Sequence, residues 1–284
     1  MPADHTGPMT DSTAGEGAGL GRRLGAGREA EVYAWGDDAV IKLYRPGFGG
    51  HRAEAAALAA LEGRHIAPSL VDVVNHDRRP GLVLERIVGE DMLTLLMRQP
   101  WRVHGLARAL AEAHLAIHDV RAPADLPDVR QTLSARIEAA VLPRALQGFA
   151  LRTLDGLPSG DRLCHGDYHP GNVMVGADRV SVIDWPNAAR GVPEADHARA
   201  ILLLRWADPL PGTSLVARGV TSAGRSLLAR AYTRAHARGS RRSLQQIESW
   251  LVVNVAARLS EGIEAERPKL IGMLARARRE ERTP

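Results

Sequence analysis

The stretch from residue 165 to residue 184 constrains the fold more than any other part of the sequence. It reads HGDYHPGN, then VMV, a polar turn GADR, and VSVID. The Pro-Gly pair keeps the first segment out of a helix, so Asp167 and Asn172 are expected on an irregular loop. The apolar runs around the polar turn predict a β-hairpin. Because a hairpin brings the start of its first strand beside the end of its second, Asn172 and Asp184 should meet, with Asp167 close by.

This predicted meeting point is rich in oxygen ligands. Asp167 and Asp184 supply carboxylates and Asn172 supplies an amide oxygen, a set that suits Mg²⁺ and phosphate oxygens better than a soft metal. A competing interpretation is a metal-dependent hydrolase, with a zinc site formed by His165, His169 and the two aspartates. The Pro-Gly pair argues against zinc, because no helix aligns the two imidazoles, and a zinc site leaves Asn172 unexplained.

Lysine is nearly absent from this chain. Of the 37 basic residues only Lys42 and Lys269 are lysines, so arginine serves wherever a generic cation is needed. Lys42 lies in the apolar run 39–43, which a turn GDD joins to a preceding glycine-rich segment, GAGREAEV at residues 25–32. The flat guanidinium of arginine does not substitute for a compact ammonium at a point-charge site. The position of Lys42 therefore indicates such a site.

The distribution of periodic segments predicts an α+β fold with two lobes. Up to about residue 88 the chain is mostly strand, and from residue 91 onward helices dominate. We expect a disordered tail at 1–19, a small mostly-β N-lobe at 20–88 and a larger helical C-lobe at 89–284. The expected elements include strands at 70–74 and 82–85, a helix at 52–61, a helix with Leu106, Leu110, Ala113 and Ile117 on one face, a helix at 133–146 bent at Pro143, and a helix with Leu244, Ile247, Leu251, Val255 and Leu259 in a stripe.

These segments together resemble the aminoglycoside phosphotransferase and choline kinase-like family, a relative of the protein kinases. His165, Asp167 and Asn172 fit the H-x-D-x-x-x-x-N loop of kinases, and residues 183–185, IDW, stand where kinases carry Asp-Phe-Gly. The tryptophan segment lacks the glycine of that motif, so a protein-kinase-like activation switch is not expected.

The resemblance extends upstream over nearly the whole chain after residue 20. Gly25, Gly27 and Val32 fit the pattern G-x-G-x-x-G-x-V, although Ala30 takes the place of the third glycine. Residues 39–42, AVIK, fit the V-A-I-K strand, and the helix that follows carries Glu54 where kinases have the glutamate that pairs with this lysine. A non-catalytic binding module of this fold would usually lack one of the key residues, and here none is missing.

The resemblance implies a role for each matching residue. ATP would lie between the lobes with its adenine against the linker at Glu85 and Ile87, and the glycine-rich loop (Gly25, Gly27, Val32) would cover the phosphates. Lys42, oriented by Glu54, would contact the α- and β-phosphates, and Asn172 and Asp184 would bind Mg²⁺. Asp167 would position the acceptor hydroxyl and take its proton. His165 and Asp196 would support the structure of the loop.

The expected acceptor is a small molecule with a hydroxyl group. A protein Ser/Thr kinase-like activity is the alternative, but signals of an activation segment and a peptide groove are missing. From residue 200 to the end, 15 Lys and Arg stand against 7 Asp and Glu, which disfavours a highly cationic acceptor, although Glu248, Glu261, Glu264 and Glu266 could form a local acidic pocket.

The amino-acid composition indicates the cellular compartment and the kinds of partner that the protein has. The single cysteine, Cys164, allows no intramolecular disulfide and fits a reducing compartment, so a cytoplasmic protein is expected. No apolar run reaches the roughly 20 residues that span a bilayer, so no membrane partner is expected. The net charge is +4, but the arginines are interspersed with acids rather than gathered in a stripe, so no nucleic-acid partner is expected. The sequence does not indicate an oligomeric state.

Overall fold

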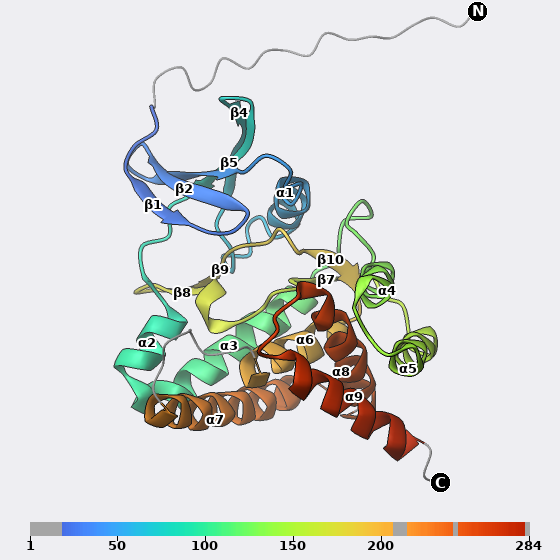
Figure 1. Cartoon of the computed structure of the whole chain (residues 1–284). Coiled ribbons are helices and arrows are strands. Elements are labelled where there is room, and N and C mark those ends of the chain that lie inside the picture. The colour runs from blue at the N-terminus through green and yellow to red at the C-terminus, as the bar shows by residue number, and fades with distance from the viewer. Residues whose placement is uncertain (1–18, 207–214, 241–243, 282–284) are drawn as a thin grey trace, which may run out of the picture.

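The computed structural model describes residues 19–206, 215–240 and 244–281. Figure 1 shows a sheet-rich N-terminal part above a larger helical part, with short strands lying between them. This arrangement confirms the predicted α+β fold. The N-terminal elements are β1 (Arg23–Ala26), β2 (Ala30–Trp35), β3 (Ala39–Tyr44), α1 (His51–Ala60), β4 (Leu70–His76) and β5 (Arg79–Glu85).

The five N-terminal strands form one antiparallel sheet in the order β1-β2-β3-β5-β4. Successive side chains of β3 point to opposite faces of the sheet, so the two faces have different surroundings. Ile41 and Leu43 pack with Val83 in a small cluster on one face. Lys42 and Tyr44 point to the other face, where Tyr44 joins the main core with α1. The sequence of β3 thus places Lys42 on the inner face of the sheet.

The rest of the chain is mainly helical. Its short strands are β6 (Glu90–Asp91), β7 (Arg162–Cys164), β8 (Val173–Val175), β9 (Val180–Val182) and β10 (Ala189–Gly191). Its helices are α2 (Met92–Arg98), α3 (Val103–His118), α4 (Val129–Ala139), α5 (Arg144–Asp155), α6 (Pro193–Trp206), α7 (Leu215–Gly239), α8 (Leu244–Arg258) and α9 (Arg267–Glu281), with 3₁₀ turns at Pro100–Arg102, Pro170–Asn172 and Leu259–Glu261.

β6 links the two parts, because it follows the first sheet in sequence and pairs with β8 in the helical part. We therefore propose a domain boundary near residue 88. The expected tail at 1–19 lies outside the described residues except for its last member.

The predicted bent helix at 133–146 is wrong, because the chain forms two helices there. α4 ends at Ala139, and Pro143 stands immediately before α5 with extended backbone, φ −55° and ψ 130°. A proline disfavours helical conformation in the residue before it, and its own ring suits the start of a helix. Pro143 therefore separates two helices rather than bending one.

The predicted stripe on α8 holds only in part. Val255 and Leu259 are buried, but Ile247 and Leu251 are only half-buried, and Leu259 lies in the 3₁₀ turn after the helix. Trp250, Val253 and the residues from 254 to 257 are buried as well, so this helix is surrounded by other helices over much of its circumference.

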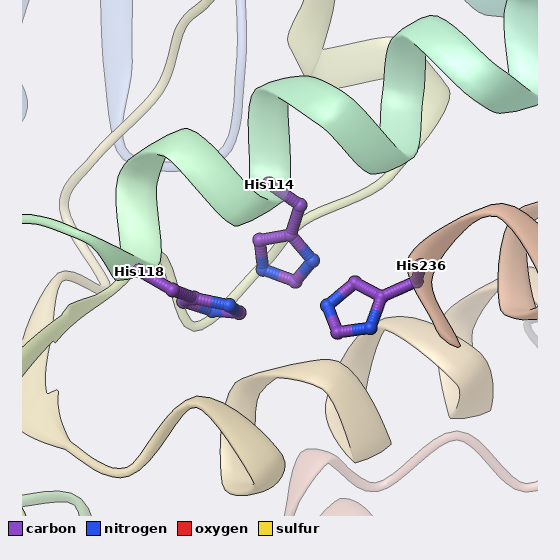
Figure 2. Close-up of side chains that lie close together, drawn as sticks. All are labelled: His114, His118 and His236. Atoms are coloured by element: carbon purple, nitrogen blue, oxygen red, sulfur yellow. The ribbon is translucent and has the colours of Figure 1, made fainter. Parts of the chain in front are cut away.

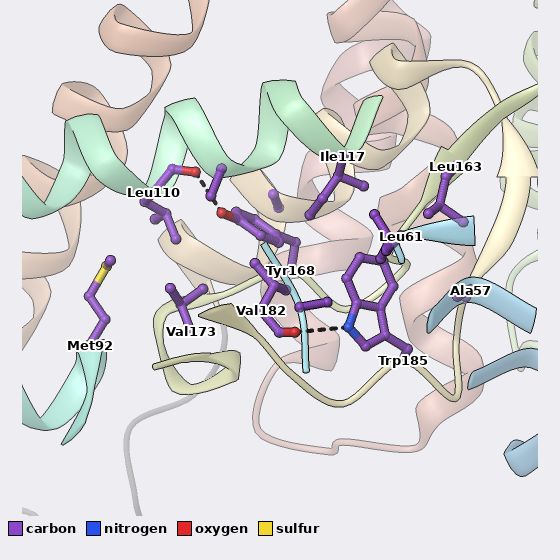
Figure 3. Packing of buried hydrophobic residues seen from close by; sticks show 14 of the residues in the cluster. Ala57, Leu61, Met92, Leu110, Ile117, Leu163, Tyr168, Val173, Val182 and Trp185 are labelled. Atoms are coloured by element: carbon purple, nitrogen blue, oxygen red, sulfur yellow. Dashed lines mark hydrogen bonds between the residues drawn. The ribbon is translucent and has the colours of Figure 1, made fainter. Parts of the chain in front are cut away.

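The main core runs from α1 through the hairpin of β8 and β9 to α3 (Figure 3). Trp185 is fully buried in it and donates a hydrogen bond from Nε1 to the Val182 carbonyl at 2.9 Å. Tyr168 is also fully buried, and its hydroxyl donates to the Leu110 carbonyl at 2.6 Å. These two aromatic side chains anchor the segments that carry Asp167 and Asp184.

Among the helices of the described residues, none combines the length and apolar character that a membrane crossing requires.

Candidate active site

A cavity of about 890 Å³ is lined by residues of both the N-terminal sheet and the helical part. Most of the residues predicted from the sequence line it, and the exceptions are Asn172, His165 and Asp196, which are buried beside or beneath it. The predicted residues in its lining are Gly25, Gly27, Val32, Lys42, Glu54, Glu85, Ile87, Asp167 and Asp184.

Lys42 joins α1 to the end of the hairpin. Its Nζ lies 2.6 Å from Glu54 Oε2 and 2.6 Å from Asp184 Oδ1. Burial disfavours the charged ammonium, but the two carboxylates outweigh burial and raise the pKa of Lys42. Glu54 is held in turn by the Tyr44 hydroxyl and by the Trp185 backbone N–H. The ammonium is therefore permanently charged and fixed in the cavity wall.

The hairpin brings Asn172 and Asp184 together as predicted. The Ile183 N–H donates to the Asn172 carbonyl at 2.9 Å, next to the paired residues of β8 and β9. Asn172 Nδ2 donates to the Asp167 carbonyl at 3.0 Å, which leaves the amide oxygen of Asn172 available as a ligand. The side chain of Asp184 is 47% exposed. An amide oxygen and an accessible carboxylate are the donor types that Mg²⁺ prefers, so these residues fit a magnesium ion.

Asp184 has a positive φ of 68°. Few non-glycine residues adopt this left-handed conformation, and aspartate and asparagine do so most readily. An asparagine at this position would keep the backbone geometry while removing the charge.

The Asp167 side chain is 32% exposed and faces the cavity. Burial raises the pKa of this carboxyl, but the His169 ring, with Nε2 3.7 Å from Asp167 Oδ2, and the Arg199 guanidinium outweigh burial and lower the pKa to about 2. Asp167 is therefore ionised at neutral pH and is a weak base. Such a carboxylate is suited to accept a hydrogen bond from a hydroxyl and to orient it.

His165 supports the loop through both ring nitrogens. Nδ1 accepts from the Asp167 backbone N–H at 3.2 Å, and Nε2 donates to the Ile183 carbonyl at 3.1 Å. The ring is fully buried, and burial lowers its pKa, so it is neutral. His169 Nδ1 accepts from the Gly171 N–H at 3.1 Å. With both nitrogens of His165 engaged, the geometry does not support the alternative zinc site.

Asp196, at the start of α6, holds the backbone of the same loop. Its fully buried carboxylate accepts from the His165 N–H at 2.7 Å through Oδ2 and from the Gly166 N–H at 2.9 Å through Oδ1. Gly166 has φ +77°, and a Cβ there would lie 2.3 Å from the Asn187 carbonyl oxygen, so only glycine fits. The loop that carries Asp167 is thus fixed from below.

A histidine cluster surrounds the far side of Asp196. His114 and His118 of α3 face His236 of α7 (Figure 2), and ring nitrogens of the three lie within 4.8 Å of one another. His114 and His118 each place Nε2 on Asp196 Oδ2, at 3.0 and 3.2 Å. His114 Nδ1 accepts from the Tyr232 hydroxyl at 2.6 Å. Because both nitrogens of His114 are engaged, the cluster is better described as a hydrogen-bond network than as a metal site.

This network predicts acid sensitivity. Burial and the neighbouring His118 lower the pKa of His114 to about 3 from an ordinary 6.5. The unfolded chain therefore binds a proton below pH 6.5 that the folded chain does not, and the free energy of unfolding should fall by about 2 kcal/mol between pH 6.5 and pH 5 from His114 alone. Burial raises the pKa of Asp196, but hydrogen bonds from His114 and His118 outweigh burial and hold this pKa well below its ordinary 3.8, and the stability that this carboxylate contributes is lost only as the pH falls below about 3.8.

Urea unfolding at pH 7 and pH 5 measures this effect. His114→Gln should show a smaller loss between the two pH values, whereas His104→Gln, at an exposed position on the same helix, should match the parent. Equal stability of the parent at both pH values would contradict the assignment of a neutral, buried His114.

Sequence reasoning did not find every residue that lines the cavity. Arg136 of α4, Asn187, Arg199 of α6 and Glu261 also line it, and they come from segments with no motif of their own. Tyr232 and His197, whose Nδ1 lies 2.9 Å from the Tyr232 hydroxyl, were missed for the same reason. Their roles depend on how the helices pack, which residue spacing does not reveal.

The model of the phosphotransferase enzyme family (APH) matches residues 21–238. No curated protein matches. Similar solved structures include the aminoglycoside phosphotransferase APH(4)-Ia in a thermostable mutant form, with a TM-score of 0.64 and 16% identity over 94% of this chain and 96% of that chain. A choline/ethanolamine kinase family protein from Mesorhizobium loti has a TM-score of 0.62 and 17% identity over 95% and 90% of the two chains.

The amicoumacin kinase hAmiN is similar to the same degree, with a TM-score of 0.63 and 13% identity over 95% of this chain and 89% of that chain. At such low identities these structures establish the fold, which is that of the kinase-like proteins. The family match covers most of the chain, and the chain belongs to the phosphotransferase enzyme family.

Proposed function

We propose that this enzyme transfers the γ-phosphate of ATP to a hydroxyl group of a small molecule, with the help of Mg²⁺. The observation that carries the proposal is the convergence of Lys42, Glu54, Asp167 and Asp184 on one cavity, with Asn172 beside them. Two structural neighbours support it. APH(4)-Ia was solved with AMP-PNP and hygromycin B, and amicoumacin kinase was solved with AMP-PNP, Ca²⁺ and Ami.

The nucleotide would occupy the part of the cavity next to the sheet. Its adenine would lie against the chain at Glu85 and Ile87, and the loop with Gly25 and Gly27 would cover its phosphates. Lys42 would then exchange its ion pair with Asp184 for contacts with the α- and β-phosphates, while Glu54 keeps it in place. Positioning and fixed charge carry most of the catalysis of phosphoryl transfer, because the transition state is loose.

Asn172 and Asp184 would hold the magnesium ion. When bound, the ion supplies positive charge that offsets the charge of the phosphate oxygens. Asp167 would orient the acceptor hydroxyl and receive its proton. The hydroxyl oxygen forms a bond to the γ-phosphorus, the bond from that phosphorus to the bridging oxygen breaks, and ADP departs with the electron pair.

The low pKa of Asp167 assigns it mainly to orientation, because a carboxylate of such weak basicity takes the proton only late in the transfer. The residues proposed for support, His165 and Asp196, keep the loop backbone in place. We propose that the enzyme works in the cytoplasm, as the single buried cysteine suggests.

Asp184→Asn tests the metal assignment. The change removes one charge while keeping volume and a left-handed backbone. Even the loss of a supporting partner of a metal ligand costs about 10- to 100-fold in metal affinity. Asp184 is proposed as a ligand itself, so the concentration of Mg²⁺ that gives half-maximal ADP formation should rise at least about tenfold. The measurement is a Mg²⁺ titration of ADP formation, with thermal unfolding alongside. An unchanged titration with a collapsed melting temperature would make Asp184 a structural residue.

A further inference from the structure

The end of the cavity formed by the helical part carries two guanidinium groups and two carboxylates. The residues that line this end are Arg136 of α4, Asp167, Asn187, Arg199 of α6, and Ser260 and Glu261 of the last 3₁₀ turn. The residues proposed for the nucleotide come mainly from the sheet. The helical end is therefore the part of the cavity left for the acceptor.

The one acid of this wall other than Asp167 is already neutralised. Glu261 accepts from Arg199 Nη2 at 2.7 Å and from Arg258 Nη1 at 2.5 Å. Arg258 also binds Glu266 through two hydrogen bonds, at 2.8 and 2.9 Å. A cationic acceptor would have to compete with two guanidinium groups for Glu261. Two of the four acids considered for a local acidic pocket, Glu261 and Glu266, are thus paired with the protein's own arginines.

Arg136, unlike Arg199 and Arg258, is not paired with a carboxylate in the described residues. It is half-buried, and its side-chain hydrogen bond in the described residues goes to Asn187 Oδ1 at 3.3 Å, an uncharged partner. Burial and the nearby Arg199 lower the pKa of its guanidinium and outweigh the carboxylates of Glu261 and Asp167, so its positive charge is only partly compensated in the cavity wall. An anion bound there would relieve this cost.

We propose that the acceptor of this enzyme carries an anionic group near its hydroxyl, a carboxylate or a phosphate, and that Arg136 binds this group. The planar guanidinium matches either oxyanion through two parallel hydrogen bonds. Asn187 orients Arg136 through the hydrogen bond to its side-chain oxygen, while Arg199 keeps Glu261 paired. The phosphorylation of such a compound rests on the proposed function, but the anion site itself does not.

Binding of a matched series of small hydroxyl compounds tests the proposal without turnover. The protein is first saturated with Mg²⁺ and AMP-PNP. Calorimetry then measures the affinity of this complex for glycerate, glycerol 3-phosphate, glycerol and choline. At least one of the two anions should bind about tenfold or more tightly than glycerol, as expected for a charge-assisted hydrogen bond. The preferred anion distinguishes a carboxylate from a phosphate acceptor.

Variants of Arg136 complete the test. Arg136→Gln should remove the preference for the anion, Arg136→Lys should restore part of it, and Arg144→Gln, at an exposed position on α5, should leave it intact. The affinity for AMP-PNP should be the same in all four proteins, which shows that they are folded. The proposal would be overturned if choline or glycerol bound as tightly as the anions, if neither anion bound, or if Arg136→Gln did not weaken the binding of the anion. Failure to bind AMP-PNP would instead count against the proposed function.

Discussion

Lys42→Arg is expected to lose about 10²-fold or more in kcat/KM for ATP, nearly as much as Lys42→Ala, although it keeps the positive charge. Lys42 Nζ sits 2.6 Å from both Glu54 and Asp184, and its side chain is only 10% exposed. The longer, planar guanidinium cannot occupy that point, and loss of one fixed electrostatic contact to a transition state costs about 10²–10³-fold.

Lys269→Arg is the matched control. Lys269 is exposed on α9 with its ammonium 6.0 Å from the ring centroid of Trp206, and arginine makes the same kind of contact. This variant should therefore equal the parent. If Lys42→Arg kept more than about a third of the parental efficiency, a loss below about 0.7 kcal/mol, the lysine would not be required, and the roles of Glu54 and the glycine-rich loop would weaken with it.

Asp167→Asn is expected to lower kcat by about 10²- to 10⁴-fold, the range for a positioned acid-base group. The substitution keeps the backbone contacts of the loop, because His165 Nδ1 and Asn172 Nδ2 bind the main chain of Asp167 rather than its carboxylate. The affinity for Mg·ATP and the melting temperature should therefore change little. Steady-state kinetics measure the loss in kcat, and nucleotide binding and thermal unfolding check that affinity and stability are kept.

Asp178→Asn provides the comparison for this variant, since Asp178 is exposed in the turn of the same hairpin. It should be indistinguishable from the parent. Near-parental turnover of Asp167→Asn would remove Asp167 from the chemistry and leave it a role in the loop alone.

The core of the site could be predicted from the sequence because its geometry is local. Asn172 and Asp184 meet through one short hairpin, and the pairing Val173 with Val182 follows directly from the turn between them. The inner-face position of Lys42 follows from strand alternation, which needs only the neighbouring residues of β3.

The remaining parts could not be predicted because they depend on long-range packing. Lys42 pairs with Asp184 across 142 positions of sequence, and Tyr232 reaches His114 across 118. Arg136 enters the cavity only because α4 packs on the later helices. The break before Pro143 was missed for a different reason, since apolar periodicity continues from α4 into α5 and hides the change of direction.

The measurement that tests the central claim most directly is ³¹P NMR of a reaction mixture. The mixture contains the enzyme, Mg²⁺, ATP and hydroxyl compounds that include hydroxy acids, sugars, choline and aminoglycosides. We expect a phosphate monoester of a small molecule that forms in equal amount with ADP, and neither signal with Asp167→Asn. ADP that appears together with inorganic phosphate alone, or with phosphate attached to protein, would contradict transfer to a small-molecule hydroxyl.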